Sequence, residues 1–228
     1  MTFLRVIFLG GIAVALLAGC DALGAGSNLS FLETGDATKN LALTRADLAG
    51  GAVTVLGPDG YCVDASTLRS TLSGGFAAIA SCRILSGGQA GTIVEPGLVT
   101  VTVSRARGGV PTPDALAEAL ETELLATREL SALAVGQMAT GGDTAFDGSD
   151  PRHWRGTFAL GNHVVGLALY APKGSPLVGP QGAAFLNTVS SRIRARSKAS
   201  DRSAEQSQTS EDQVTKRLSR LFGSRDLQ

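Results

Sequence analysis

The chain has 228 residues, with 20 Lys and Arg against 20 Asp and Glu, so its formal net charge at pH 7 is zero. This balance lacks the basic excess that is typical of nucleic-acid-binding proteins. The length suits one domain with flexible ends, and a hydrophobic fraction of 43% is enough to build a core. We therefore expect a single globular domain that does not bind nucleic acid.

The N-terminal segment has the three parts of a secretory signal. Arg5 supplies a positive charge, residues 6–17 form an apolar run, and Ala18 and Gly19 are small. An apolar run of about 12 residues would rise only ~18 Å as a helix, which is short for a hydrocarbon core of ~30 Å. A buried core helix or an uncleaved anchor is the alternative, but Cys20 stands where cleavage is expected.

Leu17, Ala18, Gly19 and Cys20 close this apolar run. They resemble the lipobox of bacterial lipoproteins, position by position. The resemblance implies cleavage before Cys20, a diacylglycerol on its thiol and an acyl chain such as palmitate on its new amine. Each buried CH₂ contributes about 0.8 kcal/mol, so these chains hold a protein to a membrane almost permanently. Asp21 follows, and at this place in enteric lipoproteins an aspartate favours the inner membrane; the outer membrane is the alternative.

With Cys20 assigned to lipid, Cys62 and Cys82 remain. Outside the cytoplasmic membrane the compartment is oxidising, so we expect this pair to form a disulfide. The alternatives are two buried thiols or a metal pair, but neither His153 nor His163 stands at a zinc-type spacing from a cysteine. We expect a structural disulfide, because the Cys-x-x-Cys redox motif is absent.

Composition divides the chain into four parts. Residues 1–19 are the predicted signal peptide, 20–48 a lipidated N-terminus and flexible tether, 49–196 a single α+β domain, and 197–228 a polar, mostly disordered tail. The apolar and basic positions of a short amphipathic helix in this tail are Val214, Leu218, Leu221 and Phe222, and Lys216, Arg217 and Arg220. Such a helix would bind a membrane surface or a partner; a frayed, solvated end is the alternative.

Alternating or apolar runs predict several strands in the first half of the domain. These predicted strands are residues 53–56, 61–63, 76–85 and 98–104. Residues 57–60 read Gly-Pro-Asp-Gly and predict a turn, whereas the polar residues 64–72 predict one helical turn.

The first predicted helix begins at Thr112, a good N-cap, followed by Pro113 at the first helical position. Its apolar stripe is Leu116, Leu120 and Leu124, which predicts a helix of about 13 residues. Residues 128–135 would extend it after a break.

Residues 154–160 and 164–171, separated by Gly161 and Asn162, predict a hairpin whose second strand is central in a sheet. A second helix is expected from residue 179 onward. Its apolar face is Phe185, Val189 and Ile193. This order predicts an α+β fold, an antiparallel β-sheet with two main helices packed against it.

Two resemblances accompany this order of elements. The early Asp59-Gly60-Tyr61-Cys62-Val63-Asp64 segment and the late tryptophan-bearing hairpin resemble a group of small uncharacterised lipoproteins of alphaproteobacteria, over roughly residues 50–195. More distantly, the layout is similar to the PsbP/Mog1-like sandwich. The second resemblance implies a fold and carries no function.

Candidate catalytic residues are few. Ser149, His153 and Asp147 could be assembled into a Ser-His-Asp set, but no Gly-x-Ser-x-Gly motif is present and closeness in sequence is not triad geometry. We expect His153 and His163 to be surface or hairpin-edge residues.

Residues 141–150 carry three aspartates whose oxygens would suit calcium. Their spacing fits neither an EF-hand loop nor the Gly-Gly-x-Gly-x-Asp repeat. Glu118, Glu121 and Glu123 are better explained as the solvated face of a helix than as acid/base groups. With no P-loop or dinucleotide fingerprint either, we expect no metal and no cofactor.

Two classes of function remain. The first is a non-enzymatic, membrane-anchored periplasmic lipoprotein that binds or helps to assemble an envelope partner. The second is a periplasmic hydrolase-type enzyme that uses the His153 region, which predicts His153 in a cleft, hydrogen-bonded to a carboxylate and near a nucleophile. The lack of catalytic motifs favours the first class, with membrane lipid bound through Cys20 and an envelope protein as a partner.

Overall fold

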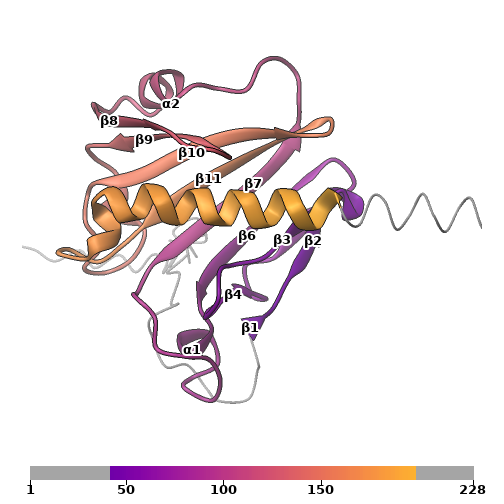
Figure 1. Cartoon of the computed structure of the whole chain (residues 1–228), viewed down its shortest axis with the longest axis vertical. Coiled ribbons are helices and arrows are strands. Elements are labelled where there is room, and N and C mark those ends of the chain that lie inside the picture. Colours follow the sequence, from indigo (N-terminus) through magenta and orange to yellow (C-terminus); the bar gives the residue numbers. More distant parts are fainter. Residues whose placement is uncertain (1–41, 199–228) are drawn as a thin grey trace, which may run out of the picture.

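The structure is a computed structural model that describes residues 42–198. The lipobox, the predicted tether up to residue 41 and the predicted tail beyond residue 198 lie outside the described residues. Within the described range, one antiparallel sheet of nine strands forms the centre of the molecule, and a long helix lies across its strands (Figure 1). The α+β class that the sequence predicts is therefore confirmed.

The strands are β1 (Ala42–Leu43), β2 (Ala46–Leu48), β3 (Val53–Val55), β4 (Tyr61–Asp64), β5 (Arg69–Thr71), β6 (Gly74–Ser81), β7 (Leu98–Arg105), β8 (Leu124–Glu129), β9 (Ala134–Met138), β10 (His153–Leu160) and β11 (His163–Tyr170). The helices are α1 (Cys82–Leu85), α2 (Pro113–Ala119), the short 3₁₀ helices η1 (Ala49–Gly51), η2 (Gly142–Thr144) and η3 (Pro176–Val178), and the long helix over residues 180–198. The large sheet has the order β1-β4-β6-β7-β11-β10-β9-β8, with β5 paired to β6, while β2 and β3 form a separate pair.

The two strand patterns that were clearest in the sequence are confirmed. In β7 the side chains of Val99, Val101 and Val103 are buried, whereas Thr102 and Ser104 are exposed. β10 and β11 form the predicted hairpin, in which Leu160 pairs with His163 across the turn. β11 lies between β7 and β10, so it is central as expected.

The helix over residues 180–198 covers one face of the sheet and confirms the second predicted helix. Its buried residues Leu186, Val189 and Ile193 are fully excluded from solvent and pack into the main core. Phe185 is partly buried, and its ring meets that of Tyr61 edge-on at a centroid distance of 4.7 Å. The apolar stripe read from the sequence is therefore the face that the helix buries.

Polar contacts fix both ends of this packing. Trp154 Nε1 donates to the carbonyl oxygens of Val178 and Gly179, each at 3.0 Å, just before the helix begins. In the last described turn of the helix, Ser197 Oγ accepts a hydrogen bond from the backbone N–H of Thr54 at 3.0 Å. That bond satisfies a buried donor of β3, so the helix supplies one acceptor to the small sheet.

The folded domain begins earlier than residue 49, the start predicted from composition. Residues 42–48 form β1 and β2, and Leu48 is fully buried against the main core. A segment with few apolar residues among polar ones resembles a linker in composition. In the structure, however, β1 pairs with β4 and β2 pairs with β3.

The first predicted helix is shorter than expected, and its extension over residues 128–135 is wrong. Thr112 caps α2 as predicted, with its Oγ1 accepting from Ala115 N at 3.3 Å. The helix ends at Ala119, and Glu121 has a φ of 52°, a left-handed conformation that stops the helix. Leu124 then lies in β8, and residues 128–135 belong to the β8–β9 hairpin.

Two further predictions need correction. The predicted helical turn over residues 64–72 is a turn followed by β5, which pairs with β6. The predicted strand over residues 76–85 is β6 only as far as Ser81, after which Cys82 opens α1. The glycine pairs at residues 74–75 and 87–88 bracket residues 76–85, but the strand ends at Ser81, well before the second pair.

Cys62 and Cys82, the pair expected from the sequence, are joined in a disulfide across a sequence separation of 20 residues. The bond links β4 to the start of α1, at one end of the sheet. A loop of this size contributes roughly 3 kcal/mol in the chain-entropy model.

Gly182 lies in the first turn of the long helix, where the helix packs closely against Leu177 and Trp154. A Cβ there would overlap the carbonyl oxygen of Leu177 and lie 2.7 Å from Trp154 Cδ1. Alanine is the better helix former by about 1 kcal/mol, yet we expect Gly182→Ala to lower the free energy of unfolding by about 2 kcal/mol because of this overlap. Urea denaturation measures the change.

The exposed neighbour Gln181 provides the control. Gln181→Ala should change the free energy of unfolding by less than about 0.5 kcal/mol. A Gly182→Ala variant as stable as the wild type would contradict the described seating of the helix.

Candidate functional site

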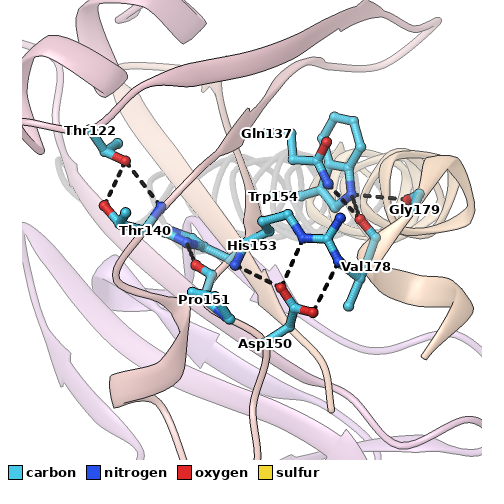
Figure 2. Close-up of polar contacts among 10 residues, drawn as sticks. Thr122, Gln137, Thr140, Asp150, Pro151, His153, Trp154, Val178 and Gly179 are labelled. Atoms are coloured by element: carbon cyan, nitrogen blue, oxygen red, sulfur yellow. Dashed lines mark hydrogen bonds and ion pairs between the residues drawn. The ribbon is translucent and has the colours of Figure 1, made fainter. Parts of the chain in front are cut away.

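His153 lies on the face of the sheet opposite the long helix. Its neighbour Trp154 points to the helix side, where it and Gln137 both donate to Val178 O (Figure 2). Because side chains alternate along a strand, His153 and Arg155 point to the other face. His153 is only 3% exposed, and it is buried there together with Tyr170.

Both ring nitrogens of His153 have partners. Nε2 accepts a hydrogen bond from Arg155 Nε at 2.8 Å, and Nδ1 lies 3.4 Å from the carbonyl oxygen of Pro151. The imidazole stacks on the Tyr170 ring at 5.1 Å, and Arg155 Nη2 donates to the Tyr170 hydroxyl at 2.8 Å. Since Nε2 accepts, the ring is neutral with its proton on Nδ1.

The surroundings keep His153 neutral over a wide pH range. Burial lowers the pKa of His153 to about 4, and the positive charge of Arg155 acts in the same direction. The Pro151 carbonyl and Asp143 raise the pKa, but less strongly. A histidine with this pKa is a poor general base near neutral pH, because a catalytic base works best with a pKa near the working pH.

The structure does not assemble the Ser-His-Asp set. Ser149 Oγ lies 2.8 Å from Gly142 O and 2.6 Å from Phe146 O, so its hydroxyl hydrogen is directed to backbone carbonyls. Asp147 is exposed, and the nitrogens of His153 are taken by Pro151 and Arg155. No contact within the described residues links the three side chains into a relay.

The aspartates of residues 141–150 do not converge either. Asp150 is bound by Arg152, whose Nε and Nη2 lie 3.0 and 3.1 Å from the two carboxylate oxygens (Figure 2). This hydrogen bonding lowers the pKa of Asp150. Asp143 and Asp147 are exposed. Among residues 42–198, no three His, Cys, Asp or Glu side chains gather closely enough to hold a metal ion.

The expectation that both histidines are surface or hairpin-edge residues is met only in part: His163 begins β11 at the hairpin turn, as expected, but neither histidine lies at the surface. His153 is 3% and His163 5% exposed. Tyr170 and Arg155 cover His153, and neither was singled out in the sequence. The hairpin turn could have indicated the pairing: Trp154 is in register with Leu169, so His153 and Tyr170 come next on adjacent strands.

An open depression of about 420 Å³ lies at the start of the long helix, beside Arg152, Ser175 and Gln181. Arg152 is its charged group, but Asp150 neutralises that charge at 3.0 Å. In the part of the chain that the structure covers, no helix has both the length and the apolar character needed to cross a bilayer.

Cys20, the predicted lipidation residue, lies outside the described residues, whereas Cys62 and Cys82 are bonded to each other. Comparison of the chain with family models, with curated proteins and with solved structures gives no match.

The neutral, buried state of His153 predicts a loss of stability in mild acid. Its pKa is about 4 when folded and about 6.5 when unfolded, so the unfolded chain takes up the proton first. The free energy of unfolding should therefore fall by up to roughly 3 kcal/mol as pH drops from 6.5 to 4. Urea denaturation at a series of pH values measures this fall.

His153→Gln retains an acceptor for Arg155 but cannot titrate. In this variant the free energy of unfolding should lose less between pH 6.5 and 4 than in the wild type, because the contribution of His153 is removed. His163→Gln leaves His153 in place, so the loss of unfolding free energy that is due to His153 should remain. An identical pH profile in the wild type and His153→Gln would contradict the assignment of a depressed pKa to His153.

Proposed function

We propose that this chain is a membrane-anchored periplasmic lipoprotein that acts without catalysis, by binding or helping to assemble a partner in the cell envelope. The observation that carries the proposal is the sequence Leu17-Ala18-Gly19-Cys20 at the end of an apolar run. Acylation of Cys20 would hold the domain at the membrane, with Asp21 favouring the inner membrane over the outer.

The disulfide supports an oxidising compartment. Cys62 and Cys82 are bonded, and Cys62 is buried among small side chains of β6 and β11. Such structural disulfides persist outside the cytoplasm and are rare within it. A secretory signal and a disulfide are independent features of the chain, and both favour export.

The start of the fold is compatible with an anchor at Cys20. The first described residue is Ala42, so residues 21–41 lie between the anchor and the domain. A chain extends at most ~3.3–3.6 Å per residue, so these 21 residues could span up to roughly 75 Å. The domain could therefore meet partners either near the membrane or well away from it.

The geometry of the His153 region supports a binding role over a hydrolase. Among residues 42–198, no carboxylate is hydrogen-bonded to His153, whose Nε2 accepts from Arg155, and the Ser149 hydroxyl donates to backbone carbonyls. We also infer a PsbP/Mog1-like arrangement, because a long helix covers one face of an antiparallel sheet. That inference concerns the fold alone and assigns no ligand.

Labelling cells with radioactive palmitate tests the anchor directly. We expect the wild-type chain to take up label and to fractionate with the inner membrane, because Cys20 would be the acylated residue. Cys20→Ser should take up no label. The double variant Cys62→Ser/Cys82→Ser is the matched control, since it removes two cysteines but leaves Cys20, and it should remain labelled.

Label on the Cys20→Ser chain, or none on the wild type, would overturn the proposal. Density-gradient separation of inner and outer membranes adds the location. Recovery of the labelled wild type in the outer membrane would correct the preference drawn from Asp21 while leaving the anchor in place.

A further inference from the structure

β8 is the outer strand at one side of the large sheet, next to α2 (Figure 1). Among residues 42–198 it pairs with β9 alone. The strand at the other side of the sheet, β1, has two residues, and β5, which also pairs with a single neighbour, has three. With six residues, β8 is therefore the longest strand of the described range whose outer side meets no other strand.

The register of β8 decides which of its backbone groups point outward. Leu130 N donates to Leu133 O at 3.1 Å across the β8–β9 turn, so these two residues form a hydrogen-bonded pair. Hydrogen-bonded and non-hydrogen-bonded pairs alternate along an antiparallel ladder. Arg128, two residues before Leu130, is therefore bonded to β9, whereas the N–H and C=O groups of Thr127 and Glu129 point away from β9.

This edge is open to solvent. Thr127, Arg128 and Glu129 are exposed, and β8 contains neither the proline nor the lysine with which many proteins protect an edge strand. The register irregularity of β8 lies before Thr127, between Leu124 and Ala126, so it leaves the outward groups of Thr127 and Glu129 in regular strand. An extended segment of another chain can pair with such an edge.

Carboxylates surround the open edge. Residues 112–130 include α2 and β8, which pack against each other, and they carry one cation, Arg128. Their carboxylates are Asp114, Glu118, Glu121, Glu123 and Glu129. All five are exposed, and none of these side chains makes an ion pair or a hydrogen bond with another residue of the described range. They are therefore available to a partner.

Cations of two other elements come near this edge. Arg194 Nη2 donates to Ala132 O at 3.2 Å in the β8–β9 turn. Arg155 lies two strands inward, in β10, where its Nε and Nη2 donate to His153 and Tyr170. Even when both are counted together with Arg128, the cations are fewer than the carboxylates, so the charge around the edge is negative.

We propose that β8 binds an extended, cationic segment of another protein, which adds a strand to the sheet. This inference rests on the proposed function, because it names the surface and the chemistry of the envelope partner. The outward N–H and C=O groups of Thr127 and Glu129 would bond to the backbone of the segment. Its lysine or arginine side chains would pair with the carboxylates of residues 112–130.

Charge favours this occupant over a second copy of the chain. Two copies joined through β8 would bring two identical sets of carboxylates together, and like charges across neighbouring strands are destabilising. The same carboxylates attract a cationic strand. They therefore protect the edge from pairing with itself while leaving it open to a partner of opposite charge.

Residue-resolved amide hydrogen exchange, measured by NMR, tests the proposal on residues 20–228 with Cys20→Ser and an intact disulfide. The probe is a synthetic eight-residue peptide in which lysine and valine alternate, and the control peptide has glutamate in place of lysine. At saturation the lysine peptide should slow exchange of the Thr127 and Glu129 N–H groups about tenfold or more. The Arg128 N–H, already bonded to β9, should change little, and the glutamate peptide should slow none of the three.

Thr127→Pro removes one outward N–H without breaking a bond to β9, a change that edge strands tolerate. It should weaken binding of the lysine peptide about tenfold or more. Thr127→Ala is the matched control, because it keeps the N–H, and it should bind within twofold of the wild type.

A second pair of variants tests the charges. Glu123→Gln/Glu129→Gln should weaken binding of the lysine peptide about threefold or more. Asp59→Asn/Glu95→Gln gives the same change in net charge on exposed loops beside Tyr61, at the start of β4. This control should weaken binding less than the Glu123→Gln/Glu129→Gln pair, by under twofold.

Equal binding of the two peptides, slowed exchange only outside β8, or unchanged binding by Thr127→Pro would overturn the proposal. Protection of the Thr127 N–H that rises with protein concentration, without peptide, would place a second copy on this edge and would also overturn it. A chain that takes up palmitate but does not bind the lysine peptide would overturn the docking edge alone. An unlabelled chain that binds the peptide would overturn the anchor alone.

Discussion

The seating of the long helix is the constraint on which the rest of the fold depends. Gly182 lets the helix begin directly against Leu177 and Trp154, because any side chain there would overlap the Leu177 carbonyl. From that start, Leu186, Val189 and Ile193 are carried along the core, and Ser197 reaches β3 to accept from Thr54 N. The long helix and the β2–β3 pair together cover this side of the sheet.

The other side of the sheet is covered by α2 and by loop residues. This cover determines the environment of His153. α2 lies over the β9 region, where a Cβ on Gly136 would be 2.9 Å from Pro113, and Phe146 packs near Tyr170. His153 is buried under this cover with Arg155 and Tyr170 as partners. The same burial lowers the pKa of His153 to about 4, while the Ser149 hydroxyl donates to backbone carbonyls.

Local patterns predicted the elements whose signals are local. The alternation of β7, the Gly161-Asn162 turn and the Thr112 cap all depend on neighbours in sequence, and the structure has them as expected. The start of the β8–β9 hairpin was predicted as helix because Leu116, Leu120 and Leu124 recur at helical spacing. The helix ends before Glu121, whose left-handed backbone conformation is not indicated by any side-chain pattern. The burial of His153 depends on long-range packing against Tyr170, so its environment could not be read from its own segment.

We propose that the chain is exported, acylated at Cys20 and oxidised at Cys62 and Cys82. Intact mass of protein purified from membranes, with and without reductant before alkylation, tests all three at once. We expect a mass for residues 20–228 plus two or three acyl chains, with two thiols that alkylate only after reduction. An unlipidated mass, or two thiols that alkylate freely, would contradict it.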